Sequence, residues 1–165
     1  MTIVIVTDTN VLINLIHIGR LPLLGALEPY QFRVPREVLD EIREPDQRAA
    51  LDAALVAGHI ERVVIDTIEA LELFGILRDV MGRGEAACLA LAATAGCYIA
   101  SDEKKRFRRR AIELIGEERI LRTESLLLEA IRRQHISVAE ADVYKLVLET
   151  KRYTMSFSSF ADLVS

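Results

Sequence analysis

A repeated pairing of short apolar runs with helical patterns constrains the fold of this chain most strongly. The first run, Ile3–Val6, is apolar and β-branched throughout, and a helical pattern over residues 11–18 follows it. Similar runs occupy residues 30–34, 60–65 and 97–100, and Ile120-Leu121 is a short edge candidate. Such runs are typical of strands that are buried on both faces. Their alternation with helical segments predicts an α/β fold with a central parallel sheet.

Glycines and prolines predict where the helices begin and end. Gly19, Gly58, Gly96 and Gly116 each follow a segment of helical periodicity, where a C-terminal glycine is favoured. Pro35 fits the first position of a helix. We predict helices over residues 11–18, 21–27, 35–43, 46–57, 67–78, 85–95, 102–114, 123–133 and 138–150. Residues 1–150 then form a single domain, and residues 151–165 form a C-terminal tail that docks on it or adds an edge segment.

Composition places the chain among globular proteins rather than membrane or secreted ones. Hydrophobic residues make up 51% of the 165 residues. No stretch approaches the roughly 20 unbroken apolar residues of a membrane span, and the start lacks the basic residues of a signal peptide. Cys88 and Cys97 lie in apolar stretches without metal-ligand spacing, which favours core thiols over a disulfide. We therefore expect a cytoplasmic protein with no membrane partner.

Two aspartates follow predicted strands directly. Asp8 comes after the first strand and Asp102 after the run at 97–100. The carboxyl ends of parallel strands are where α/β folds bind ligands. A helix cap is the alternative role for each, but neighbouring polar residues cap equally well, so we favour function for both aspartates. The supporting side chains at these positions are Thr9, Asn10, Ser101 and Glu103, of which the last is a candidate fifth acid.

Two glutamates are candidates from their helices. The apolar positions 38, 39 and 42 define a buried face, which leaves Glu41 at its edge while Glu37 and Asp40 point away. Glu41 also lies near a helix C-terminus, where the macrodipole disfavours an anion. Glu85 follows Gly-Arg-Gly and opens a helix rich in Ala and Leu. The alternatives are a solvated surface residue for Glu41 and a dipole-stabilised first-turn acid for Glu85.

The four acids together predict a site for a hard divalent cation. Oxygen ligands suit Mg²⁺ or Mn²⁺, and none of the three histidines has metal spacing, which argues against Zn²⁺. Crowded carboxylates would repel one another without such a cation. The predicted metal-binding and catalytic residues are Asp8, Glu41, Glu85 and Asp102.

One dense basic segment stands out in a chain of net charge −4. Residues 104–110 hold six cations in seven positions, with few acids nearby to pair with them. A basic segment beside an acidic pocket indicates a polyanion that is guided to the cation. A solvated helix face and an acidic protein partner are the alternatives for this segment. The predicted RNA-binding residues are Lys104, Lys105, Arg106 and Arg108. Phe107 within this segment is expected to pack in the core.

These motifs resemble those of the PIN-domain nucleases, especially small VapC-like toxins. The stretches that carry the resemblance are VTDTNVLI at 6–13, VPREVLDEI at 34–42, GEAA at 84–87 and IASD at 99–102. Asp8, Glu41, Glu85 and Asp102 match the acidic positions of that family, although the third acid is more often Asp in the toxins. The resemblance implies a three-layer α/β/α fold and a metal-dependent endoribonuclease, often a homodimer, that a cognate antitoxin blocks.

We therefore predict a Mg²⁺- or Mn²⁺-dependent endoribonuclease that acts as the toxin of a toxin–antitoxin pair. One rival is a catalytically silent PIN-like module that binds RNA or a protein. A second rival is a phosphotransferase with an aspartyl nucleophile, which needs a second Asp two residues after the first. That position holds Asn10, which counts against the second rival.

Overall fold

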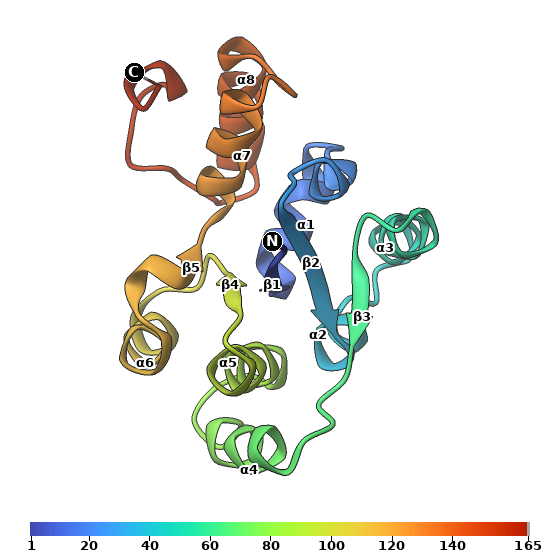
Figure 1. The fold of residues 1–165 in the computed structure, drawn as a ribbon. Coiled ribbons are helices and arrows are strands. Elements are labelled where there is room, and N and C mark those ends of the chain that lie inside the picture. Colours follow the sequence, from blue (N-terminus) through green and yellow to red (C-terminus); the bar gives the residue numbers. More distant parts are fainter. Residues whose placement is uncertain (165) are drawn as a thin grey trace.

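The computed structural model describes residues 1–164 and contains a five-stranded parallel sheet (Figure 1). The strands are β1 (Ile3–Thr7), β2 (Tyr30–Pro35), β3 (Glu61–Val63), β4 (Tyr98–Ala100) and β5 (Ile120–Leu121), in the spatial order β3-β2-β1-β4-β5. All four pairings are parallel. The predicted sheet is thus confirmed, with the two-residue β5 at its edge.

The order in which the chain adds strands reverses at the central strand, β1. The chain runs from β1 to β2 and β3 on one side, and then crosses to β4 and β5 on the other. Val6 pairs with Ile99 and Thr7 with Ala100, so the chain leaves β1 and β4 at the same level. A crevice forms where consecutive connections depart to opposite sides of such a sheet. Asp8 and Ser101 are the first residues beyond that point.

Helices cover both faces of the sheet and complete a three-layer α/β/α sandwich (Figure 1). One layer contains α4 (Ile68–Leu77), α5 (Arg83–Ala95) and α6 (Lys105–Ile115). The opposite side carries α1 (Thr9–His17), α3 (Pro45–Ala57), α7 (Thr123–Arg132) and α8 (Val138–Thr150), while α2 (Arg36–Glu41) follows β2. Short 3₁₀ turns are η1 (Leu21–Gly25), η2 (Glu117–Arg119) and η3 (Phe160–Asp162).

The core is densest around α5, which packs against the central strands. Every residue from Ala86 to Ala92 is buried, and most of them are alanines or leucines. Small side chains let this helix lie close to β1 and β4, whose Ile5 and Ile99 are also fully buried. The close approach brings the first turn of α5, with Glu85, to the end of β1. Core packing therefore fixes where one of the predicted acids lies.

Several element boundaries differ from those predicted, and two of the differences bear on the site. Pro35 ends β2 and caps α2 instead of occupying its first helical turn. Helix α6 begins at Lys105, three residues beyond Asp102, because the Asp102 carboxylate binds other segments and residues 101–104 stay extended or irregular. Phe107 is buried, as predicted.

The tail folds back on the last helix. Asp142 of α8 accepts hydrogen bonds from Ser159 Oγ (2.7 Å) and the Phe160 amide (2.8 Å), and the Phe160 ring is fully buried. This docking uses residues up to 164, and Ser165 of the predicted tail lies outside the described residues. Both cysteines are free thiols.

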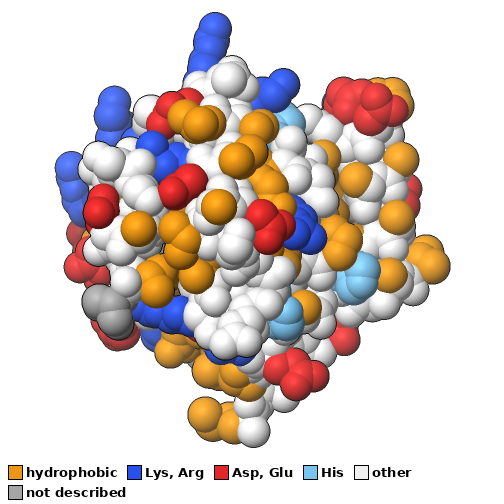
Figure 2. Space-filling model, turned by 90° about the horizontal axis from the view of Figure 1, so that it is seen from above, with side chains coloured by type: hydrophobic (Ala, Val, Ile, Leu, Met, Phe, Trp, Pro, Cys, Tyr) orange, Lys and Arg blue, Asp and Glu red, His pale blue; other side chains and the backbone are white. Residues whose placement is uncertain are grey.

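The surface is mixed in character. Seen from above, Lys and Arg side chains project at the rim, with hydrophobic and acidic side chains between them (Figure 2). Within the described part of the chain, no helix has the length and hydrophobicity needed to span a bilayer.

Candidate metal centre and nucleic-acid interface

Asp8 is held rigidly at the mouth of the crevice. It caps α1, where its Oδ1 accepts a hydrogen bond from the Thr9 amide at 2.8 Å, and its Oδ2 accepts one from Ser101 Oγ at 3.1 Å. The residue is 2% exposed. Burial, together with the charges of Glu85 and Glu41, outweighs these hydrogen bonds and raises the pKa of Asp8 from 3.8 to about 7. Asp8 is therefore both a cap and an electrostatically strained carboxylate.

Glu41 is tied to the first turns of two other helices. Its Oε1 accepts from the Gly84 amide at the start of α5 (2.8 Å), and its Oε2 accepts from Thr9 Oγ1 at the start of α1 (2.7 Å). A Cβ on Gly84 would lie 2.8 Å from both carboxylate oxygens, which real structures do not allow. A side chain at position 84 would therefore push the Glu41 carboxylate away from the Gly84 amide. The glutamate lies in a solvent-exposed position at the mouth of the crevice.

Charges on Asp8, Glu41 and Glu85 converge on one region. The half-buried Glu85 has a pKa raised by burial, and the charges of Glu103 and Glu41 raise it further. Cys88, one helical turn beyond Glu85, is fully buried, and that burial raises its thiol pKa. The negative charges of Asp8, Glu41 and Glu85 act in the same direction on this thiol. Three of the four predicted acids therefore share one electrostatic environment.

Glu37 also belongs to this region, which corrects the expectation that it points away. Its Oε1 is buried without a hydrogen-bond partner, and its charge acts on Cys88. Glu37 and Glu41 are four residues apart, so they lie within about 40° on the same helix face. The i, i+4 spacing was the signal in the sequence that identifies Glu37.

Asp102, in contrast, faces a different set of groups. Its Oδ1 accepts from the Thr123 amide (2.8 Å) and the Tyr153 hydroxyl (2.9 Å), and its Oδ2 accepts from Asn14 Nδ2 (2.9 Å) and Thr123 Oγ1 (2.5 Å). A carboxylate offers about four lone-pair positions, and these contacts occupy them, although Tyr153 shares its one hydroxyl proton between Asp102 and Glu124. Asp102 is 6% exposed and joins α1, α7 and the segment after α8.

Glu103, rather than Asp102, acts electrostatically on the other predicted acids, since its charge affects Glu85. Its carboxylate is exposed, accepts from Asn10 Nδ2 at 2.9 Å and raises the pKa of Glu85. The backbone here is fixed by side chains, since Asn10 Oδ1 accepts from the Asp102 amide (3.1 Å) and Ser101 Oγ from the Glu103 amide (3.2 Å). The supporting residues predicted from the sequence are thus all engaged around the two strand ends.

The donor set fits a hard divalent cation. It consists of carboxylate oxygens only, one of them on a strained, buried aspartate and one, Glu37 Oε1, buried without a partner. A cation would remove both unfavourable features. Across residues 1–164, no three His, Cys, Asp or Glu side chains already form an ion-binding group, and Asp8 and Glu41 accept hydrogen bonds from protein donors.

The predicted RNA-binding residues lie at and beside the start of α6. Lys104, Lys105 and Arg106 are exposed and form no ion pair with any described residue. Arg108 pairs with Glu117 at 2.9 Å, so part of its charge is neutralised. The first turn of α6 therefore provides most of the free positive charge next to Glu103.

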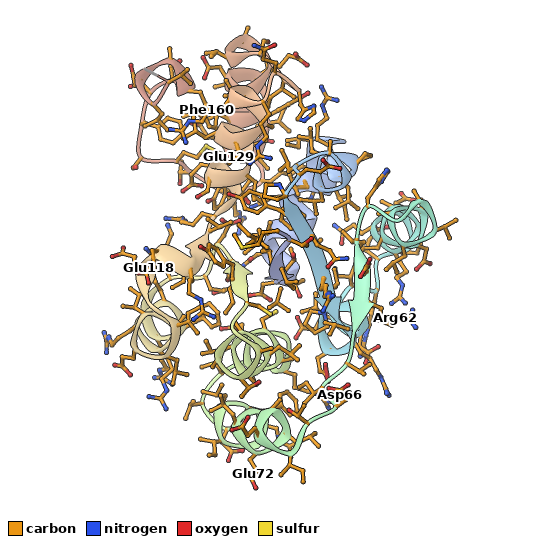
Figure 3. The ribbon with its side chains drawn as sticks, in the orientation of Figure 1. Arg62, Asp66, Glu72, Glu118, Glu129 and Phe160 are labelled. Atoms are coloured by element: carbon orange, nitrogen blue, oxygen red, sulfur yellow. The ribbon has the colours of Figure 1, made fainter. Side chains whose placement is uncertain are left out.

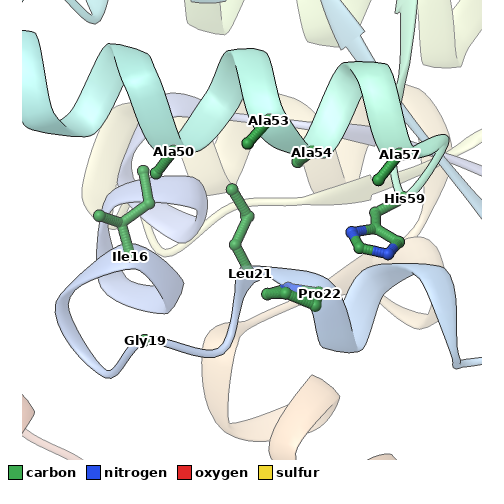
Figure 4. A pocket seen from close by; sticks show the side chains of 9 residues that line it. All are labelled: Ile16, Gly19, Leu21, Pro22, Ala50, Ala53, Ala54, Ala57 and His59. Atoms are coloured by element: carbon green, nitrogen blue, oxygen red, sulfur yellow. The ribbon is translucent and has the colours of Figure 1, made fainter.

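A largely apolar hollow lies elsewhere. It has a volume of about 370 Å³ and separates α3 from the end of α1 and η1, where Ala50, Ala53 and Ala57 face Leu21 and Pro22 (Figure 4). No acidic or basic side chain except His59 lines it. A polyanion has nothing to bind there, so the acidic crevice remains the candidate site.

Comparison with known families agrees with this geometry. The family model DUF3368, described as a PIN domain, matches residues 4–158. No curated protein matches the chain. The chain belongs to the PIN-domain family, whose members have a nuclease-type fold, are generally hydrolases and typically use divalent metals.

Proposed function

We propose that this protein is a Mg²⁺- or Mn²⁺-dependent endoribonuclease. The observation that carries the proposal is that the charges of Glu41 and Glu85 act on the buried Asp8, which lies just beyond the end of the central strand, and help to raise its pKa to about 7. Such crowding of acids is typical of sites built around a cation. The adjoining basic turn of α6 supports a polyanionic substrate.

We assign separate roles to the carboxylates and to the lysines of this site. Asp8, Glu41 and Glu85 would hold the ion, and when bound it supplies a water of lowered pKa and positive charge beside the phosphate. Lys104 and Lys105 hold the RNA backbone, so that the phosphorus faces the carboxylates. In the reaction a water oxygen attacks phosphorus, one bridging P–O bond breaks, and the leaving oxygen takes a proton.

The β4 side of the site is shared by two acids. Asp102 as a direct metal ligand stays a prediction. Its four hydrogen bonds instead favour a positioning role, in which it fixes the turn after β4. Glu103, exposed and coupled to Glu85, is then the carboxylate that this turn presents to the ion.

Cleavage of a fluorescently labelled single-stranded RNA tests the proposal. We expect wild-type protein to cut it in Mn²⁺ or Mg²⁺, and neither the Asp8→Asn variant nor wild type in excess EDTA to do so. Asp46→Asn, an exposed first-turn acid of α3, is the matched control and should leave the rate unchanged. Wild type that binds RNA but never cuts it would establish the silent-module alternative.

We further propose that the protein forms a homodimer through α4. Ile68, Leu71 and Ile76 are 76%, 52% and 61% exposed on this outer helix (Figure 1). Its first half is acidic, with Glu72 projecting outward (Figure 3), and Arg78 follows its last turn. Two copies packed through this face would remove these apolar side chains from water, which is the argument for the dimer, since Asp79 offsets the charge of Arg78.

Light scattering tests the dimer. Leu71→Glu should give a monomer, whereas Val56→Glu, at a 91% exposed position of α3, should not change the mass. A monomeric wild type at micromolar concentration would refute this assembly.

The finer assignment as a toxin rests on the family resemblance. We propose that an antitoxin covers the carboxylates and the α6 cations. Growth arrest on expression, relieved by a neighbouring gene, is the expected result.

A further inference from the structure

A polar pocket adjoins the carboxylates on the side away from Glu41. It has a volume of about 360 Å³ and lies between α1, the turn before α6 and the segment that follows α8. Lys104 lines it from one side, and Lys151 and Arg152 line it from the other. The last two residues come from a part of the chain that showed no functional signal in the sequence. Asn10 and Glu103 join the pocket to the proposed metal centre.

The positive charge in this pocket is not neutralised by the protein. None of Lys104, Lys151 and Arg152 forms an ion pair within the described residues. The pocket also contains two carboxylates, of which Asp102 is buried and bound by donors from other segments and Glu103 accepts from Asn10, so the three cations exceed the acids by one. Three free cations thus face one open hollow large enough for a nucleotide.

Arg152 occupies its place at a conformational cost. Its φ is +64°, in the left-handed region where glycine or asparagine is favoured after a helix. The backbone is fixed there, because the Arg152 amide bonds to Glu149 O (3.1 Å) and the Tyr153 amide to Leu148 O (2.9 Å). Gln134 has the same φ of +64° at the equivalent position after α7, so this is a helix-end conformation, and it fixes where the Arg152 side chain begins.

We infer that this pocket is a second RNA subsite, in which Lys104, Lys151 and Arg152 bind the phosphate of a nucleotide next to the scissile one. The inference rests on the proposed function and deepens it by adding a contact for the strand beyond the cut. An Arg fork and two ammonium groups suit a phosphate diester. The position next to Glu103 places the bound strand so that it continues toward the carboxylates.

Binding without cleavage tests this subsite. We would measure anisotropy of a labelled single-stranded 12-mer RNA in EDTA at several salt concentrations, for wild type and for the Lys151→Ala/Arg152→Gly double variant. Lys151 and Arg152 contact the same phosphate in this subsite, so their loss should reduce the salt slope by at most about 0.7, the value for one neutralised phosphate of a single strand. Affinity at low salt should fall by roughly tenfold, as counterion release implies.

The double variant is expected to fold, because its substitution at position 152 suits the local backbone. Glycine suits a φ of +64°, so Arg152→Gly should keep or raise the melting temperature. Arg62→Ala is the matched control, because Arg62 is an exposed cation on β3 at the opposite edge of the sheet (Figure 3) and should leave RNA affinity unchanged.

The outcomes separate this inference from the proposed function. An unchanged affinity and salt slope in a folded double variant would overturn the subsite, even if wild type cleaves RNA. The subsite would also be overturned if the double variant bound RNA as well as wild type does but had lost the binding of wild type to a polyglutamate peptide. That result would favour an acidic protein partner. A weakened RNA affinity supports the subsite whether or not cleavage is seen, since the assay contains no metal.

Discussion

Replacing Asp8 by Asn should stabilise the metal-free protein at neutral and basic pH. Asn caps helices as well as Asp does, so its Oδ1 keeps the bond from the Thr9 amide. The substitution removes the charge, which burial and two neighbouring glutamates make unfavourable in the folded state. It also reverses the bond with Ser101, whose hydroxyl would accept from the new amide group instead of donating to Oδ2. The usual expectation for a buried polar residue is that its replacement destabilises the fold, and here the opposite is predicted.

The size of this stabilisation and its dependence on pH follow from the raised pKa of Asp8. Between pH 3.8 and about 7 the folded protein holds a proton on Asp8 that the unfolded chain releases, so the stability due to this group falls as pH rises through that window. At 1.36 kcal/mol per pKa unit, the 3.8-to-7 shift amounts to about 4 kcal/mol at pH 8, of which about 3 kcal/mol appears between pH 5 and pH 8.

Urea unfolding in EDTA at pH 5 and pH 8 measures this difference. All other groups titrate in both proteins, so comparing the two isolates Asp8. The free energy of unfolding of Asp8→Asn relative to wild type should rise from pH 5 to pH 8 by at least about 2 kcal/mol. For a domain of this size that corresponds to about 4–8 °C in melting temperature. Asp46→Asn should show no such growth. An Asp8→Asn variant whose stability relative to wild type is the same at both pH values would refute the reasoning.

Three further outcomes are expected. Gly84→Ala should displace the Glu41 carboxylate, lower Mn²⁺ affinity and abolish cleavage. Gly75→Ala is the control and should keep full activity, because a Cβ there meets nothing within 4 Å. Equal cleavage rates for the two variants would contradict this prediction. Mn²⁺ should raise the melting temperature more at pH 8 than at pH 5, because protons compete for the carboxylates; a pH-independent shift would argue against them as ligands. Tyr153→Phe should cost about 1–2 kcal/mol in urea unfolding, since Asp102 loses a buried donor; an unchanged midpoint would show that this bond contributes nothing.

The parts of the fold that depend on local sequence were predictable. The β-branched run before Asp8 marked the central strand, and Gly58 and Gly96 ended their helices with the expected left-handed backbone. Asp8 could be chosen because strand ends meet at one edge of a parallel sheet. Glu41 followed from its place at a helix end, which the structure confirms.

The remaining parts depend on contacts between distant segments. Nothing near Asp102 in the sequence indicates that Thr123 and Tyr153 would bind its oxygens. Lys151 and Arg152 join the site only because the chain returns past α1 after α8. Glu37 was recoverable from helix phase alone, since it shares a face with Glu41.

Anomalous diffraction at the manganese edge from crystals soaked in Mn²⁺ would test the central claim most directly. The claim is that Asp8, Glu41 and Glu85 together hold a divalent cation. We predict an anomalous peak within about 2.0–2.5 Å of carboxylate oxygens from these residues, the range for hard cations, and no such peak in Asp8→Asn crystals. A well-ordered wild-type crystal with no peak at the ends of β1 and β4, or with a peak bound only by other residues, would contradict it.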